Sequence, residues 1–218
     1  MRIVVVNPNS SATVTRDIAG TLAGISAAFE VTFLADGPET IRTDEDVARA
    51  GEAFAALVER ERDAAGFITA CFSDPGLDLA RGRVAQPVTG AQEAALHEAC
   101  ARAEGFGVIA LSERAIPRHL KRIEALGLRD RLVDELPLAD VSAAASGHAP
   151  EVLERVRELA VALHGRGAGA VVLGCAGMAR IAARLERELG FPVIDPVAAA
   201  GRLALSRAGA PLTREVRE

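Results

Sequence analysis

The sequence predicts an α/β fold with two pseudo-symmetric halves, each built on a doubly wound parallel sheet, and an active site in the cleft between them. One observation is that short β-branched runs alternate with longer stretches rich in Ala, Leu, Arg and Glu. This alternation is typical of βαβ units around a parallel sheet. The other observation is an internal repeat, in which three landmarks of the first half recur in the same order in the second half.

The strands and helices follow from the period of the apolar residues along the chain. The expected strands are Arg2–Asn7, Val31–Ala35, Gly66–Ala70, Phe106–Leu111, Leu132–Leu136, Ala170–Gly174 and Pro192–Ile194. Helices are expected in the gaps, among them Asp44–Arg62, Ala91–Ala103, Glu151–His164 and Met178–Leu189.

The internal repeat indicates two homologous halves of about 100 residues each. In sequence order, Ile3–Asn7 matches Val108–Ser112, Gly66–Cys71 matches Ala170–Cys175, and Gln86–Ala91 matches Phe191–Pro196, at nearly equal offsets. Chance could give one such match, but three in the same order argue for duplication. We therefore expect an N-terminal half of residues 1–100 plus 200–218 and a C-terminal half of residues 101–199.

The composition argues against several classes of partner. The net charge is −5, no long run of Lys and Arg occurs, and Trp and Tyr are absent, so nucleic acid is not expected to bind. No apolar stretch approaches the roughly 20 residues of a membrane span. Met1 and Arg2 lead directly into a strand-like run, which favours a cytoplasmic protein without a cleaved signal.

The cysteines and histidines indicate free thiols and no metal site. Cys71, Cys100 and Cys175 form an odd, widely spaced set, unlike a disulfide framework or a zinc motif. The chain has four histidines, none at HxH or HxxxH spacing: His97, His119, His148 and His164. No metal is therefore expected.

Cys71 and Cys175 are the candidate catalytic residues because they hold equivalent positions in the repeat. Each follows a buried strand, at the edge of an α/β sheet where ligands bind. Pro75 is expected at the first position of the helix after Cys71, and a helix also follows Cys175. A helix N-terminus lowers the pKa of a thiol. Cys100 has no counterpart in the repeat, so we expect it to be structural.

A thiolate and a thiol on opposite walls of a cleft are a matched base and acid. One removes a proton from a stereocentre and the other returns a proton to the opposite face of the planar, enolate-like intermediate. This inverts the stereocentre and needs no cofactor if the carbon acid is acidic enough.

The loop after the first strand offers hydrogen-bond donors to a substrate carbonyl. Asn9 and Ser10 lie in this loop, just before a predicted helix N-terminus, which adds free backbone N–H groups. Ser112, after the strand Phe106–Leu111, would lie across the same cleft. The segment Asp74–Gly76, in contrast, is interpreted as a cap or turn.

Several segments resemble the hydantoin and allantoin racemases of the aspartate/glutamate/hydantoin racemase superfamily. They are Val5–Ser11, Ala70–Leu77, Pro87–Ala94, Leu173–Met178 and Pro192–Asp195, and the resemblance covers nearly the whole chain. It implies a two-domain α/β fold with the active site between the halves.

The resemblance also implies roles for individual residues. Cys71 and Cys175 would be the acid and base, with no metal or nucleotide. Ser112 stands where the relatives often have Thr, and this replacement keeps the hydroxyl group. The residues carried over as substrate contacts are Asn9, Phe72, Ser73, Ala176 and Gly177. The relatives often form homo-oligomers, so we expect one here.

The residues after each cysteine indicate the substrate class. Amino-acid racemases of the superfamily tend to have Asn-Thr or Thr there, which binds an α-carboxylate. This chain has Phe72–Asp74 and Ala176–Met178 instead, which favours a neutral cyclic ureide, either allantoin or a hydantoin substituted at its stereocentre. We take Phe72, Ile41 and Met178 as candidates for the wall that faces the substrate side chain.

Other functions remain open on the sequence. The nearest are an aspartate or glutamate racemase and a maleate-type cis-trans isomerase on the same scaffold. A non-catalytic ligand-binding protein or a thiol redox sensor would be a different class.

Overall fold

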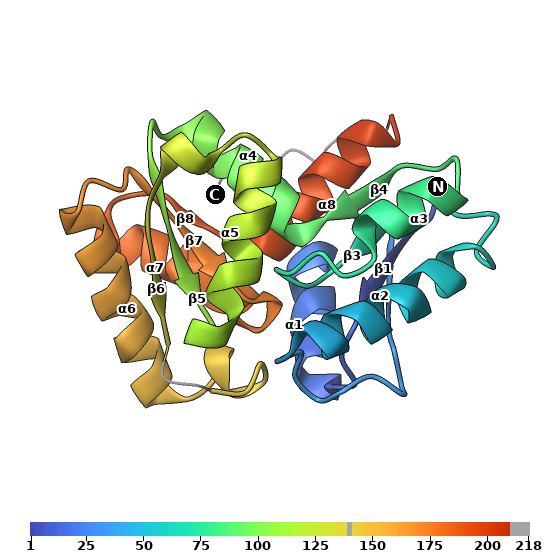
Figure 1. Cartoon of the computed structure of the whole chain (residues 1–218), viewed down its shortest axis with the longest axis horizontal. Coiled ribbons are helices and arrows are strands. Elements are labelled where there is room, and N and C mark those ends of the chain that lie inside the picture. Colours follow the sequence, from blue (N-terminus) through green and yellow to red (C-terminus); the bar gives the residue numbers. More distant parts are fainter. Residues whose placement is uncertain (139–140, 210–218) are drawn as a thin grey trace.

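Two four-stranded parallel sheets lie side by side in the computed structural model, one in each half of the chain (Figure 1). The structure describes residues 1–138 and 141–209. The predicted α/β fold with two parallel-sheet halves is confirmed. None of the described helices is both long and apolar enough to cross a membrane.

The N-terminal sheet has the strand order β2-β1-β3-β4. Its strands are β1 (Ile3–Asn7), β2 (Phe29–Phe33), β3 (Gly66–Thr69) and β4 (Val88–Gly90), and its helices are α1 (Ala12–Ala23), α2 (Asp44–Val58) and α3 (Leu77–Arg83). Successive side chains of a strand point to opposite faces of the sheet, and every residue of β1 is buried, so helices cover both faces. Val5 packs in the same core cluster as Ile18 of α1, and Val6 in the same cluster as Phe54 of α2.

The C-terminal sheet repeats this arrangement in the order β6-β5-β7-β8. Its strands are β5 (Phe106–Ala110), β6 (Leu132–Pro137), β7 (Ala170–Gly174) and β8 (Val193–Ile194), and its helices are α5 (Ile116–Ala125), α6 (Pro150–Gly165) and α7 (Ala182–Leu189).

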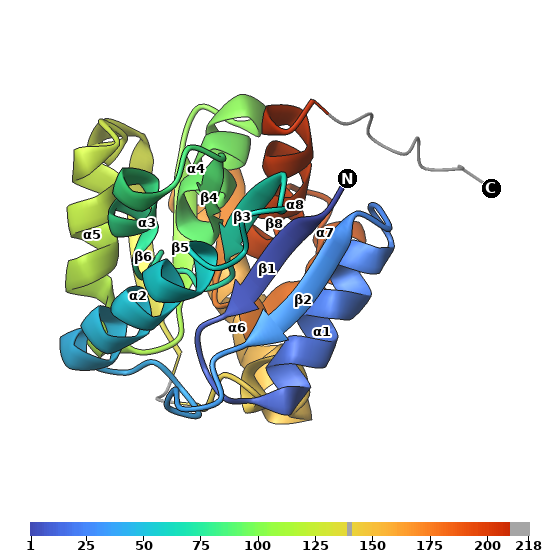
Figure 2. The ribbon, with the colours of Figure 1, turned by 90° about the vertical axis from the view of Figure 1, so that its right-hand side faces the viewer.

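Two helices cross between the halves. Helix α4 (Ala91–Arg102) follows β4 but contacts β7, whereas α8 (Pro196–Arg207) follows β8 but contacts β3 and β4. They also pack against each other (Figures 1 and 2), with a salt bridge from Arg202 to Glu98 at 2.7 Å. The halves therefore share one interface core. The boundary between the halves at residue 100 stays a prediction. Residues 210–218, which that prediction assigns to the N-terminal half, lie outside the described residues.

The strand register corrects one of the three repeat matches. Ile3 pairs with Gly66, and Phe106 pairs with Ala170. Since Gly66 and Ala170 are counterparts, Phe106 is the counterpart of Ile3, and the match to Val108 is wrong by two residues. A slip of two residues keeps every side chain on the same face, so the apolar pattern could not detect it.

Several boundaries also differ from the predicted ones. The second strand begins at Phe29 rather than Val31, and β4 is a short strand that the β-branched runs do not predict. Helix α2 ends at Val58, before Arg62. The predicted helix Met178–Leu189 divides into a 3-10 helix, Ala176–Ile181, and α7.

The turn after Cys71 is also unlike the predicted one. Pro75 is not the first residue of a helix, because α3 begins at Leu77 with Gly76 as its N-cap at φ 71°. A side chain at position 76 would be strained in this left-handed conformation. It would also collide with the backbone of Gly51 on α2.

Candidate active site

One cavity between the halves lies where β1, β3, β5 and β7 end. Ala70 and Leu111 line it directly after β3 and β5, and Gly174 lines it at the end of β7. Of the predicted site residues, the cavity is lined by Asn9, Cys71, Phe72, Ser73, Cys175, Ala176 and Gly177. The sequence therefore predicted seven residues that line this cavity, including both candidate cysteines.

Three residues named from the sequence do not line the cavity. The backbone N–H of Ser10 donates to Pro38, and Ser112 is the N-cap of a short 3-10 helix. Met178 is fully buried in the core, whereas Ile41 and Phe72 do form part of the wall. Ser10, Ser112 and Met178 are therefore not part of the cavity wall.

The two thiols have matching surroundings, as the duplication predicts. The Cys71 thiol accepts a hydrogen bond from the backbone N–H of Ser73. The Cys175 thiol accepts one from the backbone N–H of Gly177, at 3.4 Å. In each half the donor is two residues after the cysteine, so each thiol is held by the turn that follows its strand.

Burial dominates the acidity of both thiols. It raises the pKa of Cys71 to about 12, and the nearby Cys175 contributes to this shift. Burial also raises the pKa of Cys175, and hydrogen bonds from Gly177 and Ser146 offset only part of the effect. The expectation of lowered thiol pKa values is wrong, because desolvation of the thiolate outweighs its hydrogen bonds.

A tight turn packs against Cys175. Ser146 Oγ lies 3.8 Å from Cys175 Sγ and 2.8 Å from the Ala143 carbonyl oxygen. A methyl group at Gly177 would collide with that carbonyl and lie 2.8 Å from Ser146 Oγ. Only glycine at position 177 allows this approach.

Asn9 is fixed by its own loop. Its Oδ1 accepts hydrogen bonds from Asn7 Nδ2 and from the backbone N–H of Ser11, both at 2.9 Å. Ser11 in turn caps α1. With Oδ1 engaged, the Asn9 amide has its Nδ2 donor left for a ligand.

Several cavity residues were not predicted, including Thr40, Ala143, Arg118 and His119. Arg118 is largely engaged by the protein, since its Nε donates to Ser73 Oγ at 3.0 Å and a terminal nitrogen donates to backbone carbonyls. His119 is 2% exposed and contacts the Phe72 ring edge-on, at 4.9 Å between centroids.

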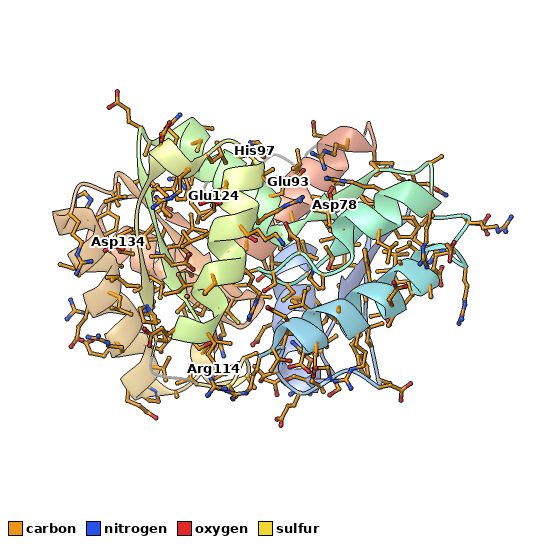
Figure 3. The ribbon with its side chains drawn as sticks, in the orientation of Figure 1. Asp78, Glu93, His97, Arg114, Glu124 and Asp134 are labelled. Carbon is orange, nitrogen blue, oxygen red and sulfur yellow. The ribbon has the colours of Figure 1, made fainter. Side chains whose placement is uncertain are left out.

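A buried carboxylate near the cavity joins helices of both halves. Glu93 on α4 forms ion pairs with Arg81, Arg122 and Arg207, at 2.9–3.0 Å. Burial alone would raise the pKa of Glu93, but the hydrogen bonds from Arg81 and Arg207 lower it to about 2. Figure 3 shows Glu93 beside α5 and Asp78 on α3.

The third cysteine lies apart from this site. Cys100, on α4, packs at the edge of the core and does not line the cavity. Across residues 1–138 and 141–209, no three His, Cys, Asp or Glu side chains form a group that could hold a metal ion.

Comparison with known proteins gives one consistent result. The family model described as Asp/Glu/Hydantoin racemase matches residues 3–204. A hydantoin racemase from Paenarthrobacter aurescens is 37% identical over 217 residues, covering 94% of this chain and 90% of that protein.

Solved structures agree. The allantoin racemase from Klebsiella pneumoniae has a TM-score of 0.88 and 32% identity, covering 99% of this chain and 91% of that one. The allantoin racemase from Pseudomonas fluorescens has a TM-score of 0.83 and 25% identity, covering 99% and 95%. The resemblance inferred from the sequence is confirmed, and this chain is a racemase that belongs to the Asp/Glu/hydantoin racemase family.

Proposed function

We propose that this protein racemises a hydantoin-type cyclic ureide, either allantoin or a hydantoin substituted at its stereocentre, without a cofactor. Cys71 and Cys175 would be its acid and base. The observation that carries the proposal is that these two thiols, equivalent by duplication, line the same cavity. The names of the relatives support the substrate class.

The proposed reaction is a two-base proton transfer. The thiolate of one cysteine takes the proton from the stereocentre, and the C–H electron pair moves into the adjacent carbonyl to give a planar enolate. The thiol of the other cysteine then protonates the opposite face. The cysteines have exchanged roles, and the product is the mirror image of the substrate.

Hydrogen-bond donors around the cavity would stabilise the enolate oxygen, which gains charge during the reaction. Asn9 Nδ2 is one such donor. The backbone N–H of Gly177 donates to Cys175 Sγ, so the turn would hold this thiol in place beside the substrate. A ring carbonyl beside the stereocentre also makes its proton more acidic than that of a free amino acid.

Arg118 is the observation that favours a second candidate, an amino-acid racemase. A guanidinium in the cavity could bind an α-carboxylate. However, its Nε and one terminal nitrogen already donate to Ser73 and to backbone carbonyls. A neutral ureide does not need this cation, so we rank the ureide first.

The test is the decay of optical rotation of enantiopure allantoin and of one aryl-substituted hydantoin. Purified protein is used with a metal chelator, and the rate in buffer alone is subtracted. We expect decay for at least one substrate, and loss of that decay in both Cys71→Ser and Cys175→Ser. Unchanged rotation of both ureides, with racemisation of aspartate or glutamate, would overturn the substrate assignment. Full activity in either serine variant would overturn the two-thiol mechanism.

A further inference from the structure

His119 brings a buried imidazole into the cavity that the two-thiol reaction does not use. It lies on α5, in the opposite half from Cys71, and its ring packs edge-on against Phe72. It lines the cavity together with both thiols. A polar side chain that is 2% exposed requires hydrogen-bond partners for its polar atoms.

One nitrogen of the ring is held firmly. His119 Nδ1 lies 2.6 Å from Glu135 Oε1, and both side chains are 2% exposed. The backbone carbonyl of His119 accepts a hydrogen bond from Gln92 Nε2 at 3.1 Å. Both the ring and its backbone are therefore fixed before any ligand arrives.

The partner determines the role of the other nitrogen. A carboxylate oxygen 2.6 Å from Nδ1 accepts the hydrogen of that nitrogen, and in the tautomer with its hydrogen on Nδ1 the ring has a free lone pair on Nε2. Among the described residues Nε2 has no hydrogen-bond partner. Because the ring lines the cavity, Nε2 is a fixed acceptor available to a ligand.

An acceptor complements the rest of this site. Among the described residues, Asn9 Nδ2 and the second terminal nitrogen of Arg118 have no hydrogen-bond partner, and both are donors. Such groups suit the carbonyl oxygens of a ligand but not its N–H groups. A cyclic ureide has both, because its carbonyls alternate with ring N–H groups.

We propose that His119 determines specificity by accepting a hydrogen bond from a ring N–H of the substrate, with Glu135 as the residue that positions it. The inference rests on the proposed function, since it needs a ureide in the cavity. It predicts that the enzyme discriminates against ureides in which that nitrogen is methylated.

The experiment pairs one variant with methylated substrates. His119→Asn keeps an N–H near the position of Nδ1 for Glu135 but removes the acceptor at Nε2. Values of kcat/KM are measured for a substituted hydantoin and for its two N-methyl derivatives, one at each ring nitrogen, with both proteins. Effects of methylation on substrate acidity are the same for both proteins and cancel in the comparison.

We expect one methylation to lower kcat/KM of the native protein by about tenfold or more, the loss of one hydrogen bond. His119→Asn should lower kcat/KM of the parent hydantoin by about tenfold, and the penalty for the same methylation should be about tenfold smaller in the variant than in the native protein. Equal methylation penalties in both proteins would overturn the role of His119. If the native protein racemises neither allantoin nor a substituted hydantoin, the proposed function fails and this inference fails with it.

A second measurement does not depend on the variant folding. The ring ¹⁵N resonances of the native protein are recorded with and without unsubstituted hydantoin. A hydrogen bond to Nε2 should shift that resonance upfield while Nδ1 changes little. Saturable binding of hydantoin without this shift would overturn the proposal.

Discussion

Asp74 accepts a hydrogen bond from the backbone N–H of Gln92, at 2.8 Å, and its other carboxylate oxygen accepts one from Glu93 at 2.9 Å. Asp74 lies three residues after Cys71, and Gln92 lies in the first turn of α4, which crosses to the other half. The carboxylate therefore ties the Cys71 turn to the helix that joins the halves. The sequence suggested that the segment Asp74–Gly76 is a cap or turn, and Asp74 does cap a helix. That helix is α4, which begins 17 residues later in the chain.

Asp74→Ala should destabilise the protein and impair catalysis. It leaves two buried N–H groups without partners, which costs about 2 kcal/mol, and it releases the Cys71 turn. Urea unfolding and racemisation rates measure the two effects. Asp78→Ala is the matched control, because Asp78 is an exposed carboxylate on α3 whose ion pairs with Arg81 and Arg122 contribute little. Equal losses in the two variants would contradict the role of Asp74.

The pH dependence of stability should report on the same carboxyl. Burial raises the pKa of Asp74 to about 7, although the N–H groups of Glu93 and Gln92 oppose this shift. With a folded pKa above the unfolded one, its contribution is complete below about pH 4 and is lost as the pH rises through about 7. We expect the Tm to fall between about pH 4 and 7, and to fall less in Asp74→Ala. Identical Tm profiles for both proteins would show that Asp74 is already ionised at low pH.

Much of the fold was predictable because it depends on local pattern. The β-branched runs and their repeat gave seven of the strands and the two-sheet architecture. The strand β4 was missed because its β-branched run is short, although the repeat match of Gln86–Ala91 to Phe191–Pro196 marks it as the counterpart of β8. The crossing of α4 and α8 was not predictable either, because a helix sequence shows that one face is buried but not which sheet buries it.

The site was predictable where it follows the repeat. Cys71 and Cys175 were found because duplication places them at equivalent strand ends. His119 and Arg118 come from a helix whose position depends on how the halves pack. One signal for His119 was present, since it lies four residues before the buried Ile123 on the apolar face of α5. A single buried histidine is nevertheless more often structural than functional.

The raised thiol pKa values predict how the rate depends on pH. If a thiolate is the base, its fraction grows about tenfold for each pH unit below the pKa of the thiol. The values for Cys71 and Cys175 are both raised by burial. We therefore expect kcat/KM to rise steadily between about pH 7 and 9, without a plateau. A plateau beginning near neutral pH in initial rates of rotation decay would contradict this expectation.

Ser146→Ala should slow racemisation in both directions equally. The single hydroxyl proton of Ser146 has two acceptors, the Ala143 carbonyl oxygen at 2.8 Å and Cys175 Sγ at 3.8 Å. Loss of the hydroxyl removes a donor that can turn to the sulfur and favour its thiolate. We expect kcat/KM to fall by about tenfold. Enantiomers have equal free energies, so kcat/KM must fall by the same factor for each. Ser142→Ala is the control, because that hydroxyl accepts the N–H of Ala145 in the same turn. A loss as large in the control would assign the effect to the turn rather than to Cys175.

Gly177→Ala should reduce both stability and activity, because position 177 has no room for a side chain. The added methyl group would collide with the Ala143 carbonyl and crowd Ser146 Oγ, and overpacking of this kind costs about 1–3 kcal/mol. Relief of the collision would move the turn that holds the Cys175 thiol, so the rate should fall more than the loss of stability alone explains. Gly20→Ala is the opposite case, because Gly20 lies inside α1 with no atom within 4 Å of the added methyl group.

Gly20→Ala should therefore stabilise the protein by roughly 0.5–1 kcal/mol through higher helix propensity, with no change in rate. Thermal unfolding and kcat/KM are measured for both variants under identical conditions. A Gly177→Ala protein with native kcat/KM would mean that the turn can move without displacing Cys175. The close approach at position 177 would then serve packing, not catalysis.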